Sequence, residues 1–280
     1  MLVLLSPAKT LDFESPIPGV KMTQPSLEAE AVGLVDLLRD KTVREIGRLM
    51  TLSDKLARLN HERFQEWSYP PSPDRARPAL LAFNGDVYEG LDASTLSASS
   101  RRWAQEHLRI LSGLYGVLRP LDALQPYRLE MGTRLPNARG ADLYRFWGHR
   151  VTTELNQQIA HLRRSGEEAL VVNLASEEYF KVVRTQPVAK TGDDPGGPGL
   201  QAPIVHPVFQ DEAEDGSFKV VSFYAKRARG LMARAIVEGQ MTQATHLHSF
   251  NGGGYRFVSS LSSPERPVFR RAASDRGGTS

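Results

Sequence analysis

The stretch LLSPAKTLDF, residues 4–13, joins the end of an apolar run to a polar loop. The run, residues 2–5, is apolar without alternation, which is the pattern of a strand buried on both faces. Pro7 follows it and cannot donate to the hydrogen-bond ladder of a sheet. Lys9 lies two residues after Pro7, and Asp12 lies three residues after Lys9. Because α/β proteins place ligands just beyond strand ends, Lys9 is a candidate ligand-binding residue.

Two later stretches repeat this pattern of an apolar run, small residues and then a lysine. NLASEEYFK, residues 173–181, follows an apolar LVV, and YAKRARGLMAR, residues 224–234, follows KVVSF. If the three runs are neighbouring strands of one sheet, Lys9, Lys181 and Lys226 converge on one edge of it. The alternative is that all three are ordinary solvated lysines.

Apolar runs and amphipathic segments are interleaved along the chain, which predicts a mixed α/β protein. Besides 2–5, we expect strands at 79–83, 169–176, 204–209, 218–225 and 255–261. We expect helices at 26–40, 42–50, 53–67, 100–116, 143–164 and 226–238. The order is not a clean βαβ repeat, so the expected fold is a mixed sheet with surrounding helices. It forms a single domain at 1–262, with a flexible insertion at 190–203 and a disordered tail at 263–280.

The composition excludes several classes of protein. The 280 residues include no cysteine, which excludes disulfides, thiolate metal sites and a cysteine nucleophile. No apolar run approaches the roughly 18 residues that a transmembrane helix needs, so we expect a cytoplasmic protein without membrane contact. Phosphate-loop and serine-hydrolase motifs are absent, and the histidines lack a metal-ligand spacing. We therefore expect no cofactor and no metal site.

The positive charge of the chain is grouped rather than spread evenly. The formal net charge is only +3, but residues 101–150 carry nine arginines against four acids. Residues 226–234 carry four basic residues and no acid. In the predicted helix 226–238 these cations gather at the amino-terminal end, where the helix dipole favours anions. An anion bound at that end would relieve the mismatch; a solvated basic face is the alternative.

Residues 107–132 predict a helix-hairpin-helix, an element whose glycine-containing hairpin offers backbone N–H groups to a DNA phosphate. The nearby arginines that could bind phosphate are Arg109, Arg119, Arg128 and Arg134. Tyr115 and Tyr127 could stack on a base, with core packing as the alternative. Residues 48–60 are a second candidate hairpin that carries Lys55, and an ordinary helical corner is the favoured interpretation there.

Seven sequence blocks together closely resemble the YaaA-like peroxide stress protein family. The resemblance runs from Met1 to about Val258 and departs only at 190–203 and after 258. The blocks are LLSPAKTLDF, LSDKLARLN, AFNGDVYEGL, LRILSGLYGVLRPLDALQPYRLEMG, LYRFWG, VVNLASEEYFK and SFYAKRARGLMAR.

The resemblance implies a bacterial cytoplasmic protein that helps cells survive hydrogen peroxide. In such a protein the free intracellular iron is limited, which spares DNA from iron-driven oxidation. The resemblance also implies an unusual α/β fold, a positively charged cleft that binds double-stranded DNA, and a helix-hairpin-helix element. Nothing in the residues indicates a dedicated iron site.

Three functions remain open at this stage. The first is a DNA-binding stress protein, whose nucleic-acid-binding residues would be Lys9, Lys55, Arg109, Arg119, Arg128, Lys181, Lys226, Arg229 and Arg234. The second is a lysine-dependent enzyme acting on damaged DNA or a nucleotide, with Lys9 as the amine and Asp12 or Glu178 moving protons. The third is a small-anion or nucleotide binder.

Overall fold

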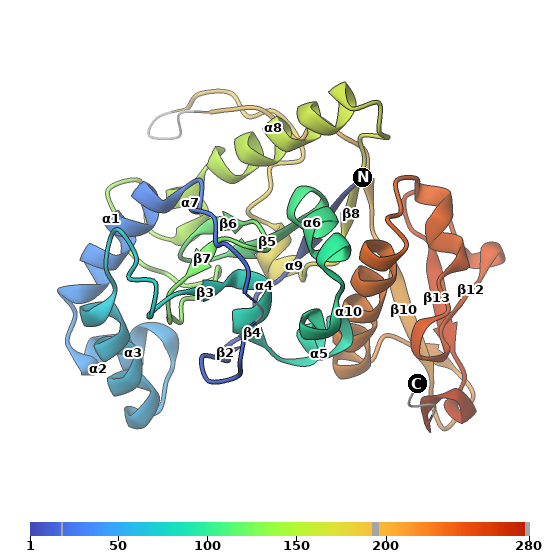
Figure 1. The fold of residues 1–280 in the computed structure, drawn as a ribbon, viewed down its shortest axis with the longest axis horizontal. Helices are drawn as coiled ribbons and strands as arrows, with labels where there is room; N and C mark the ends of the chain where they lie inside the picture. Colours follow the sequence, from blue (N-terminus) through green and yellow to red (C-terminus); the bar gives the residue numbers. More distant parts are fainter. Residues whose placement is uncertain (18, 192–195, 278–280) are drawn as a thin grey trace.

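A five-stranded mixed sheet forms the centre of the computed structural model, which describes residues 1–17, 19–191 and 196–277 (Figure 1). Its strand order is β6-β5-β1-β8-β9. The strands are β1 (Leu2–Leu5), β5 (Leu108–Ser112), β6 (Gly116–Leu118), β8 (Val171–Asn173) and β9 (Ile204–Val205). β1 pairs in parallel with both β5 and β8, and all four of its residues are fully buried. The predicted mixed α/β fold and the predicted buried strand at 2–5 are therefore confirmed, and the structure places that strand inside the sheet.

The remaining strands form one further sheet and two short pairs. The four-stranded sheet has the order β11-β10-β13-β12. Its strands are β10 (Val208–Glu212), β11 (Phe218–Lys219), β12 (Arg256–Phe257) and β13 (Val268–Arg271). The short pairs join β2 (Thr10–Leu11) to β4 (Phe83–Asn84) and β3 (Arg77–Pro78) to β7 (Ala123–Leu124).

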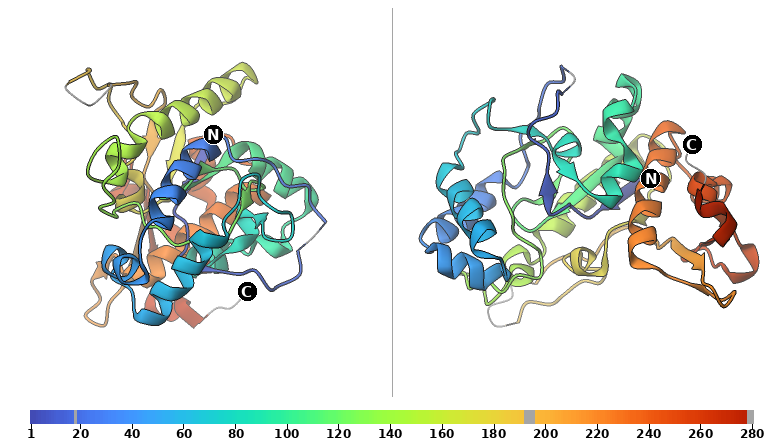
Figure 2. Two further views of the ribbon diagram at one scale, coloured as in Figure 1. Left: turned by 90° about the vertical axis from the view of Figure 1, so that its left-hand side faces the viewer. Right: turned by 90° about the horizontal axis from the view of Figure 1, so that it is seen from below.

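Helices surround the central sheet on several sides. In Figure 1, α1, α2 and α3 lie at one end, α8 runs across the top, and α10 stands between the central sheet and the four-stranded sheet. Figure 2 shows the same separation of α1–α3 from the C-terminal layer when the molecule is seen from below. The α-helices are α1 (Glu28–Arg39), α2 (Val43–Met50), α3 (Asp54–Glu66), α4 (Ala79–Ala82), α5 (Asp86–Leu91), α6 (Ala98–His107), α7 (Leu143–Trp147), α8 (Arg150–Arg164), α9 (Glu177–Phe180) and α10 (Ser222–Glu238). Short 3-10 helices lie at Ala93–Thr95, Ala244–Ser249, Gly252–Gly254, Ser259–Leu261 and Ala273–Gly277.

The predicted helix over 100–116 is wrong in its second half, and with it the helix-hairpin-helix at 107–132. α6 ends at His107, and β5 and β6 follow as an antiparallel pair. Gly116 has a φ of +69°, a left-handed conformation that suits the reversal of the chain. All residues of β5 and β6 are buried. Their apolar side chains fill the core, so the segment offers no exposed hairpin to a phosphate.

The second candidate hairpin, at 48–60, does consist of two helices. α2 and α3 are joined by residues 51–53, and Thr51 is left-handed with a φ of 52°. A capping box begins α2, in which Thr42 and Glu45 exchange hydrogen bonds. The two helices are as predicted, and a nucleic-acid-binding role for this corner stays a prediction.

Two predicted strands are helical in the structure. Residues 79–82 form α4, and only Phe83 and Asn84 of that region pair as a strand. Residues 218–219 are β11, but α10 already begins at Ser222. Lys226 therefore lies in the second turn of a helix, not beyond a strand. Tertiary packing explains this, because α10 lies directly against α5 with Gly230 at the contact.

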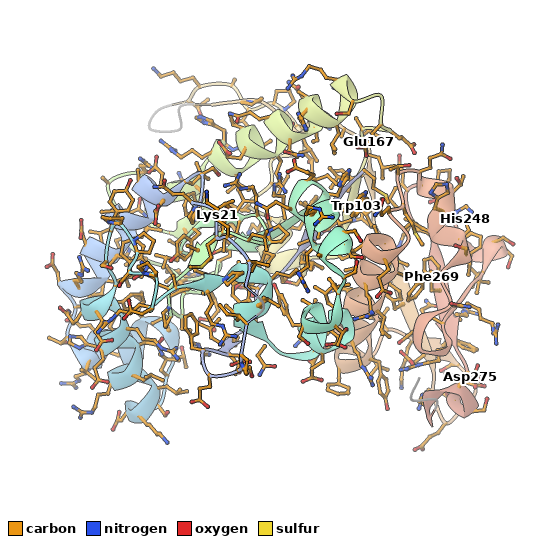
Figure 3. The ribbon with its side chains drawn as sticks, viewed as in Figure 1. Lys21, Trp103, Glu167, His248, Phe269 and Asp275 are labelled. Carbon is orange, nitrogen blue, oxygen red and sulfur yellow. The ribbon has the colours of Figure 1, made fainter. Side chains whose placement is uncertain are left out.

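The predicted disordered tail at 263–280 is wrong for most of its length. β13 lies inside the four-stranded sheet, parallel to β10 and antiparallel to β12. Phe269 is fully buried and belongs to the same cluster of buried apolar residues as Met1. Figure 3 labels Phe269 and Asp275 within this layer. Residues 278–280 lie outside the described part of the chain.

The flexible insertion predicted at 190–203 is described only in part, because residues 192–195 lie outside the described ranges. Its later residues contact α8. The side chain of Asn156 donates to the carbonyl of Gly199 over 2.9 Å and accepts from the amide of Gln201 over 2.8 Å. These two bonds hold residues 199–201 against the helix.

Gly230→Ala is expected to destabilise the protein, because α5 and α10 touch backbone to backbone. A Cβ on Gly230 would lie 1.9 Å from the carbonyl oxygen of Val87, and one on Gly90 would lie 2.4 Å from that of Arg227. Such overpacking costs at least about 1–3 kcal/mol. Urea unfolding measures the loss. Gly33→Ala is the matched control, since nothing lies within 4 Å of its Cβ position and alanine favours the helix by about 0.5–1 kcal/mol. Equal stabilities of the two variants would contradict the close contact.

Candidate functional site

A cavity of about 330 Å³ lies where β1 and β8 end and α5 and α10 begin. Because β1 and β8 are parallel neighbours, their carboxyl ends open at the same edge of the sheet. Lys9 and Lys226 both line this cavity, but Lys181 does not, and Lys226 comes from a helix rather than from the end of a neighbouring strand. The lining residues are Ser6, Pro7, Ala8, Lys9, Thr10, Asn84, Gly85, Asp86, Val87, Tyr88, Glu130, Leu174, Ser176, Glu178, Tyr179, Lys226 and Arg229.

Hydrogen bonds around Ser6 join three of the segments that build the cavity. The backbone amide of Ser176 donates to Ser6 Oγ over 2.8 Å, and the two hydroxyls lie 3.2 Å apart. The Tyr88 hydroxyl donates to the carbonyl of Ser6 over 3.0 Å. Burial raises the pKa of Tyr88 well above its ordinary value, so this hydroxyl keeps its proton and its bond. The ends of β1 and β8 and the start of α5 are thereby fixed together.

Lys9 lies at the mouth of the cavity as one partner of a charge cluster. Its side chain is 67% exposed, and its Nζ lies 3.1 Å from Glu130 Oε1. Arg128 Nη2 lies 3.1 Å from the same oxygen. A nucleophilic lysine is commonly activated by desolvation or by a neighbouring cation. Lys9 is instead mostly solvated and directly paired with a carboxylate, which is a setting for binding rather than for attack.

Arg229 and Lys226 bring positive charge from α10 to the other side of the cavity. Arg229 is half-buried, and burial lowers the pKa of its guanidinium. Within the described ranges, no carboxylate forms an ion pair with it. Lys226 is exposed to solvent and is likewise unpaired among the described residues. A partly desolvated cation without an acidic partner is a candidate anion ligand.

Arg109, Arg119 and Arg234 do not join this site, so the single groove predicted from the sequence is not formed. Arg109 is only 6% exposed, and its guanidinium donates to the carbonyls of Gln105 and Leu108. Burial lowers the pKa of Arg109 to about 10. It lines a separate cavity of about 360 Å³ together with Arg119.

Arg119 and Arg234 are both engaged in holding neighbouring segments. Arg119 pairs with Asp122 at 2.9 Å and donates to the carbonyl of Gln24. Arg234 donates to the carbonyls of Leu91 and Asp92, which fixes the end of α5 against α10. Both arginines therefore stabilise the fold.

The other predicted cations are scattered. Lys181 lies over the ring of Tyr144, with its Nζ 4.9 Å from the ring centre. Lys55 is exposed in the first turn of α3, and Arg134 is exposed in a loop. Arg128 is close to the site through Glu130 but does not line the cavity itself.

Asp12 lies in a turn outside the lining of the cavity. Its Oδ1 accepts from the amides of Ser15 and Glu14, each over 2.9 Å, and lies 3.6 Å from Arg77 Nη1. The bonds from Ser15 and Glu14, assisted by the charge of Arg77, hold the pKa of Asp12 at about 2. The carboxylate stays ionised at neutral pH and does not line the cavity, so a role for Asp12 in moving protons stays a prediction.

Asp12→Asn is expected to lower stability at neutral pH but not in strong acid. The folded state holds the pKa of Asp12 at about 2, below the ordinary value of 3.8. A depressed pKa stabilises the folded state above pH 4, and that contribution is lost as pH falls through about 2. Urea unfolding of both proteins at pH 6 and pH 2 measures the difference. A stability gap as large at pH 2 as at pH 6 would show that the charge of Asp12 is not its cause.

Tyr115 and Tyr127 belong to the core, so their predicted stacking on a base is wrong. Tyr115 is fully buried and Tyr127 is 5% exposed. The Tyr115 hydroxyl accepts from Trp67 Nε1 over 3.0 Å, and that of Tyr127 lies 2.7 Å from Ser112 Oγ. Burial raises the pKa of both hydroxyls. The alternative interpretation, core packing, is the one that the structure supports.

Sequence reasoning missed Glu130, Asn84, Asp86 and Ser176 as lining residues. One signal for Glu130 was available, because it is one of only four acids in the arginine-rich stretch 101–150. Arg63 was also missed. It lies on α3 close enough to Arg128 that burial and the charge of Arg128 both lower its pKa. Positive charge thus continues from the cavity mouth toward α3.

Within the described ranges, no group of three or more histidine, aspartate or glutamate side chains is arranged to hold a metal ion. The buried His107 has other partners. It stacks on Trp103 at 3.9 Å, and its Nε2 lies 2.9 Å from Glu167. Figure 3 shows Trp103 and Glu167 on the upper side of the molecule. In the same described ranges, no helix has both the length and the apolar character needed to cross a membrane.

Comparison with known proteins identifies relatives of the whole chain. The family model described as "Peroxide stress protein YaaA" matches residues 1–261. A UPF0246 protein of Azoarcus sp. (strain BH72) is 53% identical over 271 residues, which are 97% of this chain and 99% of the relative. A UPF0246 protein of Burkholderia pseudomallei (strain 668) is 50% identical over 273 residues, covering 98% and 99% of the two chains.

Proposed function

We propose that this chain, which belongs to the family of the peroxide stress protein YaaA, binds double-stranded DNA and limits free iron during peroxide stress. The family name supports a general role in oxidative stress. DNA binding is a more specific proposal, which is supported by the resemblance and by the cations around the cavity. The limitation of iron is supported by the resemblance alone, and no described residue is assigned to it.

The observation that carries the proposal is the unpaired positive charge at the start of α10. Lys226 and Arg227 are exposed, and Arg229 is half-buried without an ion-pair partner among the described residues. Lys9, across the cavity, exposes two thirds of its side chain. Three of these cations, Lys9, Lys226 and Arg229, thus line one opening from two distant segments. Backbone phosphates are the natural partners of such a group, since they require positive charge without fixed sequence readout.

A track of further cations extends this surface toward the helical corner. Arg128 and Lys9 both form an ion pair with Glu130. Arg63, which lies on α3, is close to Arg128. Lys55, also on α3, is exposed. We propose that a duplex crosses the cavity mouth and follows this track, and that Arg63 is a further phosphate contact.

Fluorescence anisotropy with a labelled duplex across a salt series tests the proposal. Neutralising about four phosphates gives a slope of about −3.6 in log K against log salt, at about 0.9 for each phosphate. No binding at low salt, or binding that does not respond to salt, would reject a backbone-reading DNA binder. A length series of oligonucleotides separates it from a small-anion binder, because only a duplex binder gains affinity with length.

A lysine-dependent enzyme acting on damaged DNA or a nucleotide is the second candidate. The observation that favours it is that Lys9 shares the cavity with the hydroxyls of Ser6 and Ser176 and with the carboxylate of Glu130. In that reaction the Lys9 amine would add to a sugar aldehyde and lose water to form an imine. Borohydride trapping on abasic DNA tests this candidate, and the absence of any adduct that depends on Lys9 would reject it.

A further inference from the structure

The charges that line the cavity are balanced, although its surroundings are basic. Three cations, Lys9, Lys226 and Arg229, face three carboxylates, Asp86, Glu130 and Glu178. Glu130 is 17% exposed, whereas Lys9 is 67% exposed. A dianionic phosphate inside the cavity would meet about as much repulsion as attraction. The interior therefore suits an uncharged group, and the exposed cations suit the phosphates beside it.

The uncharged part of the lining combines apolar walls with hydrogen-bonding side chains. Pro7, Ala8, Val87 and Leu174 supply apolar surface. The amide and hydroxyl groups come from Asn84, Ser6, Thr10 and Ser176. Flat, mostly apolar ligands with polar edges are bound by such a combination. A nucleobase is a ligand of this kind, because its faces stack and its edge carries donors and acceptors.

The size of the cavity restricts what can enter. About 330 Å³ lies at the lower end of the range for small-molecule pockets, which is about 300–1,000 Å³. A duplex cannot enter a space of this size. One nucleoside can, provided that it has left the base stack.

We propose that the cavity receives one nucleoside turned out of a DNA duplex, while Lys9 and Lys226 hold the adjoining phosphates. The inference rests on the proposed DNA binding and specifies which part of the DNA the cavity binds. Turning a base out costs a few kcal/mol, and the cost is smallest where the base is mismatched or damaged. The protein therefore binds most tightly to duplexes with a weakened base pair, whether or not it goes on to catalyse a reaction.

A duplex that carries 2-aminopurine in a mismatch tests the inference, because the fluorescence of this base rises when it leaves the stack. Wild-type protein is expected to raise the fluorescence severalfold. Ala8→Phe fills the cavity and is expected to abolish the rise. Its affinity for a perfectly paired duplex, measured by anisotropy, is expected to stay within about twofold of wild type, since phosphate contacts are sequence-independent. Val87→Phe is a second filling variant from another segment, in case the first does not fold.

The outcomes separate this inference from the function on which it rests. A fluorescence rise in wild type that both filling variants lose, with duplex affinity kept, supports the nucleoside site. Tight duplex binding with no rise in fluorescence overturns the nucleoside site and leaves DNA binding in place. A failure of the wild-type protein to bind any duplex overturns the proposed function and this inference with it.

Discussion

The double variant Lys9→Glu with Lys226→Glu is expected to bind duplex DNA about 100-fold more weakly than wild type at moderate salt, with a salt slope smaller by about 2. Both lysines border the same cavity from segments more than 200 positions apart in the chain. Each reversal removes one phosphate contact and places a carboxylate where the phosphate would lie. The two losses are expected to add, because in the proposed complex the two side chains contact different phosphates.

The matched control for this experiment is Lys21→Glu with Lys219→Glu. Both lysines are exposed, and neither lines the cavity. Figure 3 labels Lys21 on the amino-terminal loop. The control changes the net charge by the same amount, so it separates a local phosphate site from the overall charge of the protein. Equal loss of affinity in the two double variants would show that the cavity cations have no special part in binding.

The comparison of the two double variants requires that both fold as the wild-type protein does. Lys9 and Lys226 are exposed, so substitution is not expected to disturb the core. Lys9→Glu does place a second carboxylate beside Glu130, which removes the present ion pair. Thermal unfolding of each variant tests this point, and a melting temperature within a few degrees of wild type is the expected result, because exposed ion pairs contribute little to stability.

The centre of the fold could be predicted from the sequence because its signals are local. Residues 2–5 and the apolar part of 169–176 are short runs buried on both faces, and both became central parallel strands. The structure pairs these two strands in parallel, which places Lys9 near the segment after β8. Continuous apolar runs identify such strands without any knowledge of their neighbours.

The rest of the site depends on contacts between distant segments, which no local pattern contains. LRILS in β5 fits a helical period as well as a strand, and its pairing with β1 decides between them. KVVSF looks like a strand, but from Ser222 onward its residues are helical because α10 packs on α5. Glu130 reaches the cavity only through the loop that follows β7. Local propensity is overridden at each of these places by tertiary packing.

The C-terminal layer is the clearest such case, and Asp211→Ala is expected to be the most destabilising single substitution we propose. Asp211 is fully buried on β10. It accepts from Arg271 Nε on β13 and from the Tyr255 hydroxyl, each over 2.7 Å. The Arg271 guanidinium also lies over the rings of Tyr224 and Tyr255, 4.7 and 4.6 Å from their centres. One carboxylate thus holds a buried cation that connects β10, β13 and α10.

Removing Asp211 leaves the buried charge of Arg271 without its carboxylate, which costs about 3–5 kcal/mol. For a chain of this length such a loss lowers the melting temperature by about 10 °C. Calorimetry of Asp211→Ala measures it. Asp215→Ala is the matched control, because that exposed aspartate lies in the turn between β10 and β11 and accepts only from nearby Ser217. Its loss is expected to stay below about 1 kcal/mol.

A chain that ends at Ser262 lacks β13 and Arg271 altogether. The deletion exposes the fully buried Phe209 on β10 and leaves Asp211 without its cation. Because both an apolar surface and a buried charge lose their partners, the truncated chain is expected to unfold cooperatively at a much lower temperature than the full chain. A truncated chain that melts together with the full-length protein would restore the interpretation of residues 263–280 as a dispensable tail. It would also predict that Asp211→Ala is harmless, so the two measurements test the same structural claim independently.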